Sequence, residues 1–214
     1  GSGYARNNAG QILINPANGL PVIDAVFRVR GDRNPNFTTG WSNNFRFKNW
    51  RVSMLWDLKV GGDIYNGNNE LLTKNGISKS TADRYEPRVV TGVLNDGLQN
   101  SANPTPNTIV VIPAYNDQYY ATMPVEEFIE KGVNWFRLRD LTINYTFRPN
   151  LIKGVKSLSA FITGNDLILL TNYSGVDPAV NGLTAGARGV GGFGFDYGTL
   201  PAPVQINIGI KASF

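Results

Sequence analysis

The chain has 214 residues and a formal net charge of +4, and only 17% of its residues are charged, against roughly 25% in typical soluble domains. It contains no histidine and no cysteine, which excludes Ser-His-Asp catalysis, thiol catalysis, disulfides and histidine-ligated zinc within this chain. The sequence has no run of five or more Lys or Arg residues, so nucleic-acid binding has little support. It also has no stretch of 18 apolar residues, which a transmembrane helix would need.

The first long element in chain order is a predicted β-hairpin. Residues 1–36 are loop-like, and a strongly alternating segment follows at residues 37–47. Its aromatic side chains share one face and its polar side chains mostly the other, which is the period of two expected of a strand. Alternation resumes over residues 50–60, directly after Lys48 and Asn49. Two alternating segments joined by so short a connection predict a hairpin.

Three further strands are predicted, at residues 134–147, 156–170 and 203–214. In the first of these the apolar positions change parity near Arg139 and Asp140. A β-bulge there would add one residue and restore a single apolar face. The last strand is the most regular, and it finishes on an aromatic residue.

Long polar segments at residues 61–133 and 173–202 alternate with very short connections. Transmembrane β-barrels show this asymmetry, with tight periplasmic turns and long extracellular loops. The predicted strands have at least 11 residues, and a tilted strand needs about 9–11 to cross a bilayer. A soluble β-sandwich binding module is the alternative, but its strands usually have about 5–6 residues. We therefore predict an all-β fold made of antiparallel transmembrane strands.

Motifs typical of enzymes carry little weight in this chain. The G-x-G-x-x-G match at residues 189–194 lies within a glycine-rich loop, without the strand and helix of a dinucleotide site. Glu126, Glu127 and Glu130 are expected on one solvated helical face, unlike the opposed carboxylates of a glycosidase. The aspartates lack EF-hand spacing. We expect no catalytic residue, no cofactor and no metal site.

An aromatic group in the first long loop is a candidate contact site. Tyr115, Tyr119 and Tyr120 lie close together in the sequence. Aromatic rings stack on sugars and pack on peptides, so these side chains could contact a substrate or a lid protein. Packing within the loop itself is the alternative interpretation.

Six sequence blocks occur in a recognisable order. They are GDRNPNFTTG (31–40), VGGDIYNG (60–67), WFRLRDLTINY (135–145), GNDL (164–167), NYSGVDP (172–178) and the closing strand ending at Phe214. Together they resemble the C-terminal part of the SusC/RagA-like TonB-dependent outer-membrane transporters of Bacteroidota. Ala179 departs from this pattern, because the family usually has glutamate there.

The resemblance implies a barrel of about 22 strands in the bacterial outer membrane, with an N-terminal plug and a TonB box. Neither the plug nor the TonB box is expected in this chain. Five strands cannot close such a barrel, so other residues must supply the rest of it. With the C-terminus on the periplasmic side, residues 1–36, 61–133 and 173–202 are expected to be extracellular.

The function implied is TonB-dependent import of a large nutrient, either a glycan or an oligopeptide, beneath a SusD-like lipoprotein lid. The other expected partners are the rest of the barrel, outer-membrane lipid and, through the plug, TonB. Such a protein performs no bond chemistry. A SusC-like scaffold subunit without transport is the alternative within the same family, and the soluble β-sandwich is the alternative outside it.

The closing strand suggests a role of its own. Ile206, Ile208, Ile210 and Phe214 share one face of it. The strand looks like the signal that the barrel-assembly machinery recognises by pairing with an exposed strand edge. A simple interfacial aromatic is the alternative interpretation of Phe214.

Overall fold

The structure, a computed structural model, describes residues 1–149, 151–179 and 192–214. These residues form two compact units. The loop unit comprises residues 1–32, 64–130 and 192–198, and the strand unit comprises residues 33–63, 131–149, 151–179 and 199–214. The expected division after residue 36 therefore differs from the observed one. Residues 1–32 fold together with most of the first long loop, because that loop supplies the apolar side chains that they bury.

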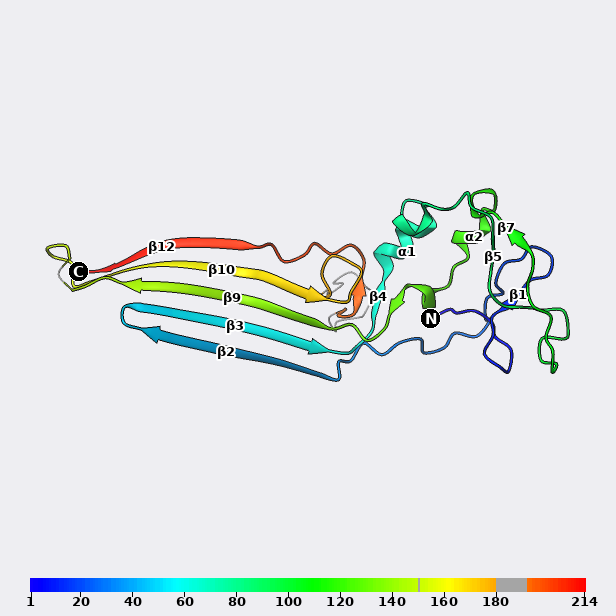
Figure 1. Ribbon diagram of the computed structural model, residues 1–214, viewed down its shortest axis with the longest axis horizontal. Helices are drawn as coiled ribbons and strands as arrows, with labels where there is room; N and C mark the ends of the chain where they lie inside the picture. Colours follow the sequence, from blue (N-terminus) through cyan, green and yellow to red (C-terminus); the bar gives the residue numbers. More distant parts are fainter. Residues whose placement is uncertain (150, 180–191) are drawn as a thin grey trace. The chain divides into compact units, whose positions relative to one another are not determined.

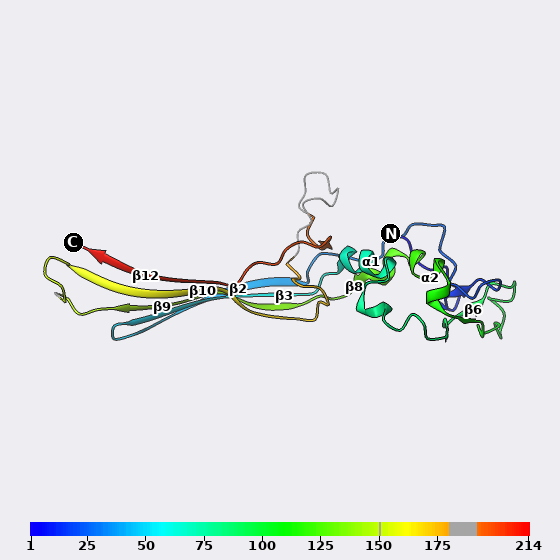
Figure 2. The same ribbon diagram turned by 90° about the horizontal axis from the view of Figure 1, so that it is seen from above.

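The strand unit is built around one antiparallel sheet, with the strand order β12-β10-β9-β3-β2 (Figure 1). Its strands are β2 (Phe37–Phe47), β3 (Trp50–Val60), β9 (Trp135–Thr146), β10 (Ser157–Thr171) and β12 (Gln205–Ser213). The bounds of the first two coincide with the ranges expected from the sequence, and the other three differ by one or two residues at each end. Viewed from above, the strands twist along their length (Figure 2), as β-strands do.

A two-residue turn joins β2 to β3. Phe47 pairs with Trp50, and Lys48 between them adopts a φ of 52°. This left-handed conformation is uncommon for a residue with a side chain, but tight turns require it. The side-chain amide of Asn49 donates a hydrogen bond of 2.7 Å to the Thr146 carbonyl, which fixes the turn against β9.

Alternation along the strands separates two faces of the sheet. The apolar face carries an aromatic stack in which the Trp56 ring lies 6.2 Å from that of Trp41 and 4.8 Å from that of Phe136. The opposite face is mainly polar. On the apolar face many large side chains are exposed, and they include Phe37, Trp41, Phe45, Trp50, Ile162, Ile206, Ile208 and Ile210.

The β-bulge predicted near Arg139 is confirmed. On β3, Leu55 pairs with Asp140 and its neighbour Trp56 pairs with Leu138, so Arg139 is the extra residue in β9. The bulge lets the apolar residues on both sides of it share one face, because it absorbs the change of parity.

The loop unit contains short strands and helices within segments that were expected to be mainly loops. Its strands are β1 (Leu13–Ile14), β4 (Ile64–Asn66), β5 (Arg88–Val89), β6 (Val93–Leu94), β7 (Val110–Val111), β8 (Ile129–Glu130) and β11 (Phe195–Asp196). Its helices are α1 (Gly67–Lys74), η1 (Lys79–Thr81), η2 (Pro113–Tyr115), α2 (Gln118–Ala121) and η3 (Val125–Phe128). The strands pair as β1-β6, β5-β7 and β11-β4-β8. Among the described residues, none of the helices is both long and apolar enough to cross a bilayer.

The interior of the loop unit joins its N-terminal segment to the long loop. Ile14 and Ile64 are completely buried, and Phe128 nearly so. Near η3, the Arg30 guanidinium donates a hydrogen bond of 2.7 Å to the Glu126 carboxylate, and both side chains are largely buried. This ion pair links segments almost one hundred residues apart.

The expectation that Glu126, Glu127 and Glu130 share one solvated helical face is wrong. Glu126 and Glu127 lie in η3, whereas Glu130 lies in the strand β8. Burial raises the pKa of the Glu127 carboxyl, and the neighbouring Glu126 raises it further. The glutamates are therefore structural groups of the loop unit.

We predict that Ile14→Ala lowers the free energy of unfolding of the loop unit by about 2–5 kcal/mol, because it leaves a cavity at a fully buried position. The measurement is the hydrogen-exchange rate of the Val93 amide in the full-length protein. This N–H donates a hydrogen bond to the Ile12 carbonyl. Leu98→Ala, at a side chain that is 57% exposed, is the control. Equal exchange rates in the two variants would contradict the prediction.

Candidate functional site

A charged cluster lies on the polar face, at the end of the sheet where β3 ends and β9 begins. We define it by the residues Asp57, Arg137, Arg139, Asp166 and Asp177. Acidic and basic groups alternate within it. The Arg139 guanidinium joins Asp57, at 2.9 Å, to Asp166, at 3.3 Å. Arg137 in turn joins Asp166, also at 3.3 Å, to Asp177.

Strand irregularities bring these side chains together. Arg139 is the bulge residue of β9, and Asp166 lies where β10 also departs from regular pairing, between Asn165 and Ile168. Asp166 adopts a φ of 51°, a conformation that aspartate tolerates better than most residues. Its carboxylate therefore meets both arginines of the neighbouring strand.

Arg137 and Asp177 are the buried members of the charged cluster. Their exposed fractions are 2% and 7%. Burial opposes ionisation of the Asp177 carboxyl, but hydrogen bonds from Arg137 and from the Ala179 N–H outweigh it, so the pKa of Asp177 is lowered. Because buried charges are costly unless they are paired, this contact ties the start of the last loop to the sheet.

The surroundings of the charged cluster are polar and aromatic. The Lys59 ammonium lies 4.6 Å from the centroid of the Trp135 ring, and the Trp135 indole N–H donates to the Asp57 carboxylate at 3.3 Å. A cavity of about 210 Å³ adjoins Arg137 and Arg139 and is also lined by Thr199, Leu200 and Ala202. The arrangement presents paired charges to this cavity and holds a loop in place.

The sequence interpretation missed the charged cluster as a set. It anticipated the bulge at Arg139 but paired no charges. A signal was present in the predicted hairpin and strand, because Asp57 and Arg137 face each other in register. The partnership of Arg137 with Asp177 crosses 40 residues of chain, and no periodicity encodes it.

The three tyrosines of the candidate contact site separate into two groups, because Tyr115 packs on a fourth tyrosine and the other two pack on each other. Tyr115, at the end of η2, packs on Tyr85 with ring centroids 6.2 Å apart, and 79% of its surface is exposed. Tyr119 and Tyr120, both in α2, pack on each other at 5.0 Å, and the Arg88 guanidinium lies 5.9 Å from the Tyr119 ring. Contact of these residues with a substrate or a lid protein stays a prediction.

The closing strand β12 lies at one edge of the sheet. Ile206, Ile208 and Ile210 are 65%, 78% and 75% exposed, and Phe214 just beyond the strand is 77% exposed. Their proposed role as an assembly signal also stays a prediction. The first half of the glycine motif, residues 189–191, lies outside the described residues.

Comparison with known proteins identifies relatives. No protein-family model matches the chain. The TonB-dependent receptor P3 of Formosa agariphila is 27% identical over 191 residues, which cover 87% of this chain and 17% of that protein. The TonB-dependent receptor P26 of the same organism is 27% identical over 200 residues, covering 89% of this chain and 18% of that protein.

The chain is thus similar in sequence to proteins named TonB-dependent receptors. This confirms the resemblance seen in the sequence blocks. The solved structure of the RagAB peptide transporter has the same fold, with a TM-score of 0.58 and 17% identity over all of this chain and 21% of that chain. A second structure, of the RagAB peptide importer in its closed-closed state, has a TM-score of 0.57 and 16% sequence identity. The match covers all of this chain and 22% of that chain. The chain spans less than a fifth of the length of the curated proteins that it matches.

We predict that Arg137→Met weakens attachment of the last loop by about 3–5 kcal/mol, because it leaves the Asp177 carboxylate buried without its main partner. The measurement is amide exchange of Ala179 in the full-length protein. Lys131→Met, which removes an exposed ion pair with Asp63, is the control and should cost below about 1 kcal/mol. Similar losses in both variants would contradict the prediction.

Attachment of this loop is also predicted to depend on pH. Because the folded pKa of Asp177 lies below its ordinary value of 3.8, its stabilisation is complete above that value and is lost as the pH falls through the folded pKa. Exchange of the Ala179 amide, corrected for intrinsic rate, should therefore accelerate in strong acid. Asp177→Asn should abolish this acceleration, and its persistence in that variant would assign the effect to another group.

Proposed function

We propose that the chain forms part of the wall of an outer-membrane β-barrel of about 22 strands, within a transporter that imports a large nutrient. The observation that carries the proposal is the sheet with one exposed apolar face and one polar face. Such a sheet fits between lipid and a water-filled lumen. In this arrangement the aromatic stack of Trp41, Trp56 and Phe136 contacts lipid, and the charged cluster lines the lumen.

Strand length supports a membrane-spanning wall. The five strands have between 9 and 15 residues, and a strand rises about 3.3 Å per residue. An 11-residue strand is therefore about 36 Å long, and tilted by about 45° it spans about 25 Å, the height of the apolar band of such barrels. A soluble sandwich would instead need a second sheet on the apolar face, and the described strand unit contains a single sheet.

Both edges of the sheet support incorporation into a larger barrel. Strands β2 and β12 each pair on one side only among the described residues. Unpaired backbone groups are costly in hydrocarbon, so further strands must complete the wall. Other parts of the same polypeptide could supply these strands, because the relatives extend far beyond the segment matched here.

The connections support an orientation. The turn at Lys48 and the connection from residue 147 to 156 leave the same end of the sheet, whereas the long connections leave the opposite end. In barrels of this kind the short turns are periplasmic. We therefore place the charged cluster near the extracellular end, and residues 1–36, 61–133 and 173–202 outside the cell.

The partners and cargo follow from the family resemblance. We propose that a SusD-like lipoprotein closes the extracellular side, that TonB energises import through a plug, and that the cargo is a glycan or an oligopeptide. The exposed aromatic surface at Tyr115 offers one contact for cargo or lid. The barrel-assembly machinery would recognise the closing strand through Ile206, Ile208 and Ile210 with Phe214.

We predict that Ile208→Arg impairs barrel assembly in the full-length protein, because an arginine facing lipid near mid-membrane costs about 2–4 kcal/mol. Asn207→Arg, the neighbouring position on the polar face, is the matched control and should assemble normally. The measurement is heat-modifiable electrophoretic mobility of protein recovered from outer membranes. Equal assembly of the two variants would show that this face does not contact lipid.

Import itself is tested in cells that carry the full-length protein. Fluorescent oligopeptides and glycans of graded size should accumulate in the periplasm, and depletion of TonB should abolish accumulation. Deletion of the gene is the control for background entry. If the barrel assembles correctly but neither cargo class accumulates in the periplasm, with or without TonB, the result would favour the scaffold alternative.

A further inference from the structure

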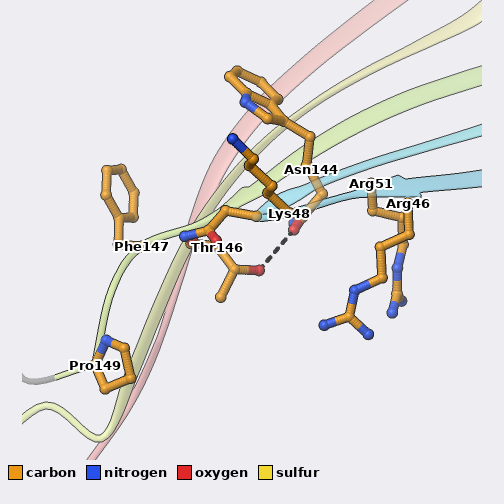
Figure 3. Close-up of a pocket in the computed structure, with 9 residues that line it drawn as sticks. Arg46, Lys48, Arg51, Asn144, Thr146, Phe147 and Pro149 are labelled. Carbon is orange, nitrogen blue, oxygen red and sulfur yellow. Dashed lines mark hydrogen bonds between the residues drawn. The ribbon is translucent and has the colours of Figure 1, made fainter.

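Two arginines lie side by side near the turn that joins β2 to β3. Arg46 and Arg51 are direct partners in the register of the two strands, and both are exposed. Figure 3 shows their side chains extending next to each other, at a hollow of about 320 Å³ that is also lined by Asn144 and Thr146. Both arginines occupy positions of the polar face.

This end of the sheet holds no acidic residue that could neutralise them. Residues 41–54, 142–163 and 205–214 contain no Asp or Glu. The nearest acidic position of the polar face is Asp140 of β9, which pairs with Leu55, four positions from Arg51, and this corresponds to about 13 Å along a strand. That separation exceeds the screening length of about 8 Å at physiological ionic strength.

The register makes the pair unfavourable on its own. Like charges at directly opposed cross-strand positions repel each other. Neither Arg46 nor Arg51 forms an ion pair with any residue that the structure describes, whereas both arginines of the charged cluster do. Two adjacent guanidinium groups present planar, forked donors, which match the geometry of a carboxylate.

We propose that Arg46 and Arg51 form a carboxylate-binding site that holds an acidic side chain from a lumen-filling segment of the same polypeptide. This inference rests on the proposed function, in which the polar face lines the lumen of a barrel. Barrels of about 22 strands have a plugged lumen. The relatives are more than five times as long as the matched segment, so the polypeptide has residues to fill it.

Conductance tests the role of the pair. The double substitution Arg46→Gln with Arg51→Gln, made in the full-length protein in planar bilayers, should raise the open-channel probability at least tenfold. Lys211→Gln, which removes a cation from the polar face of β12, is the matched control and should stay closed. A double variant as closed as the parent protein would overturn the proposal.

The same variants separate a plug contact from a cargo contact. Reduced uptake of acidic oligopeptides through a channel that stays closed at rest would assign the arginines to cargo, and would overturn the proposal. Failure of the parent protein to assemble as a heat-modifiable barrel would instead refute the proposed function. The two failures are therefore distinguishable.

Photocrosslinking can identify the segment that occupies the carboxylate-binding site in a protein that retains both arginines. A photoreactive phenylalanine at Asn44, on the polar face beside the pair, should crosslink to a segment of the same polypeptide that contains Asp or Glu. The same residue at Phe45, on the apolar face, is the control and should yield no such product. Crosslinks from position 44 only to a separate protein, or to none, would overturn the proposal.

Discussion

If the sheet lies in a membrane, as we propose, the need to pair every backbone N–H and C=O group is the constraint on which the rest of the structure depends. A strand in hydrocarbon has no water to satisfy these groups, so each strand must lie between two others. In the five-stranded sheet, β3, β9 and β10 meet this condition, and within the part of the chain that the structure describes β2 and β12 meet it on one side only. Alternating apolar and polar side chains then follow, because a paired strand directs successive residues to opposite faces.

The polar face has two ends of different chemical character. Near the start of β9, three carboxylates and two guanidinium groups alternate, so every charged group of the cluster has a partner within the chain itself. Near the turn at Lys48, only cations are present. The first end holds its own loop in place, whereas the second, under our proposal, binds a carboxylate from another segment of the polypeptide. The two ends therefore differ in how much of their stability is local.

Patterns of short range were predictable from the sequence. The period of two in residues 37–60 predicts the hairpin, and a change of parity predicts the bulge at Arg139, since both depend on neighbours along the chain. The small strands of the loop unit were not predictable, because pairs such as β1-β6 join segments about 80 residues apart. The same reason hid the contact of Arg137 with Asp177 and the separation of the tyrosines into two groups.

The bulge residue Arg139 has a consequence for strand register. Its guanidinium binds Asp57 on one neighbouring strand and Asp166 on the other. If β9 shifted by one residue, its side chains would turn to the opposite face, and both ion pairs of Arg139 would break together. Arg139 therefore opposes a shift of β9 relative to both of its neighbours at the same point, and one side chain helps to fix the register of three strands.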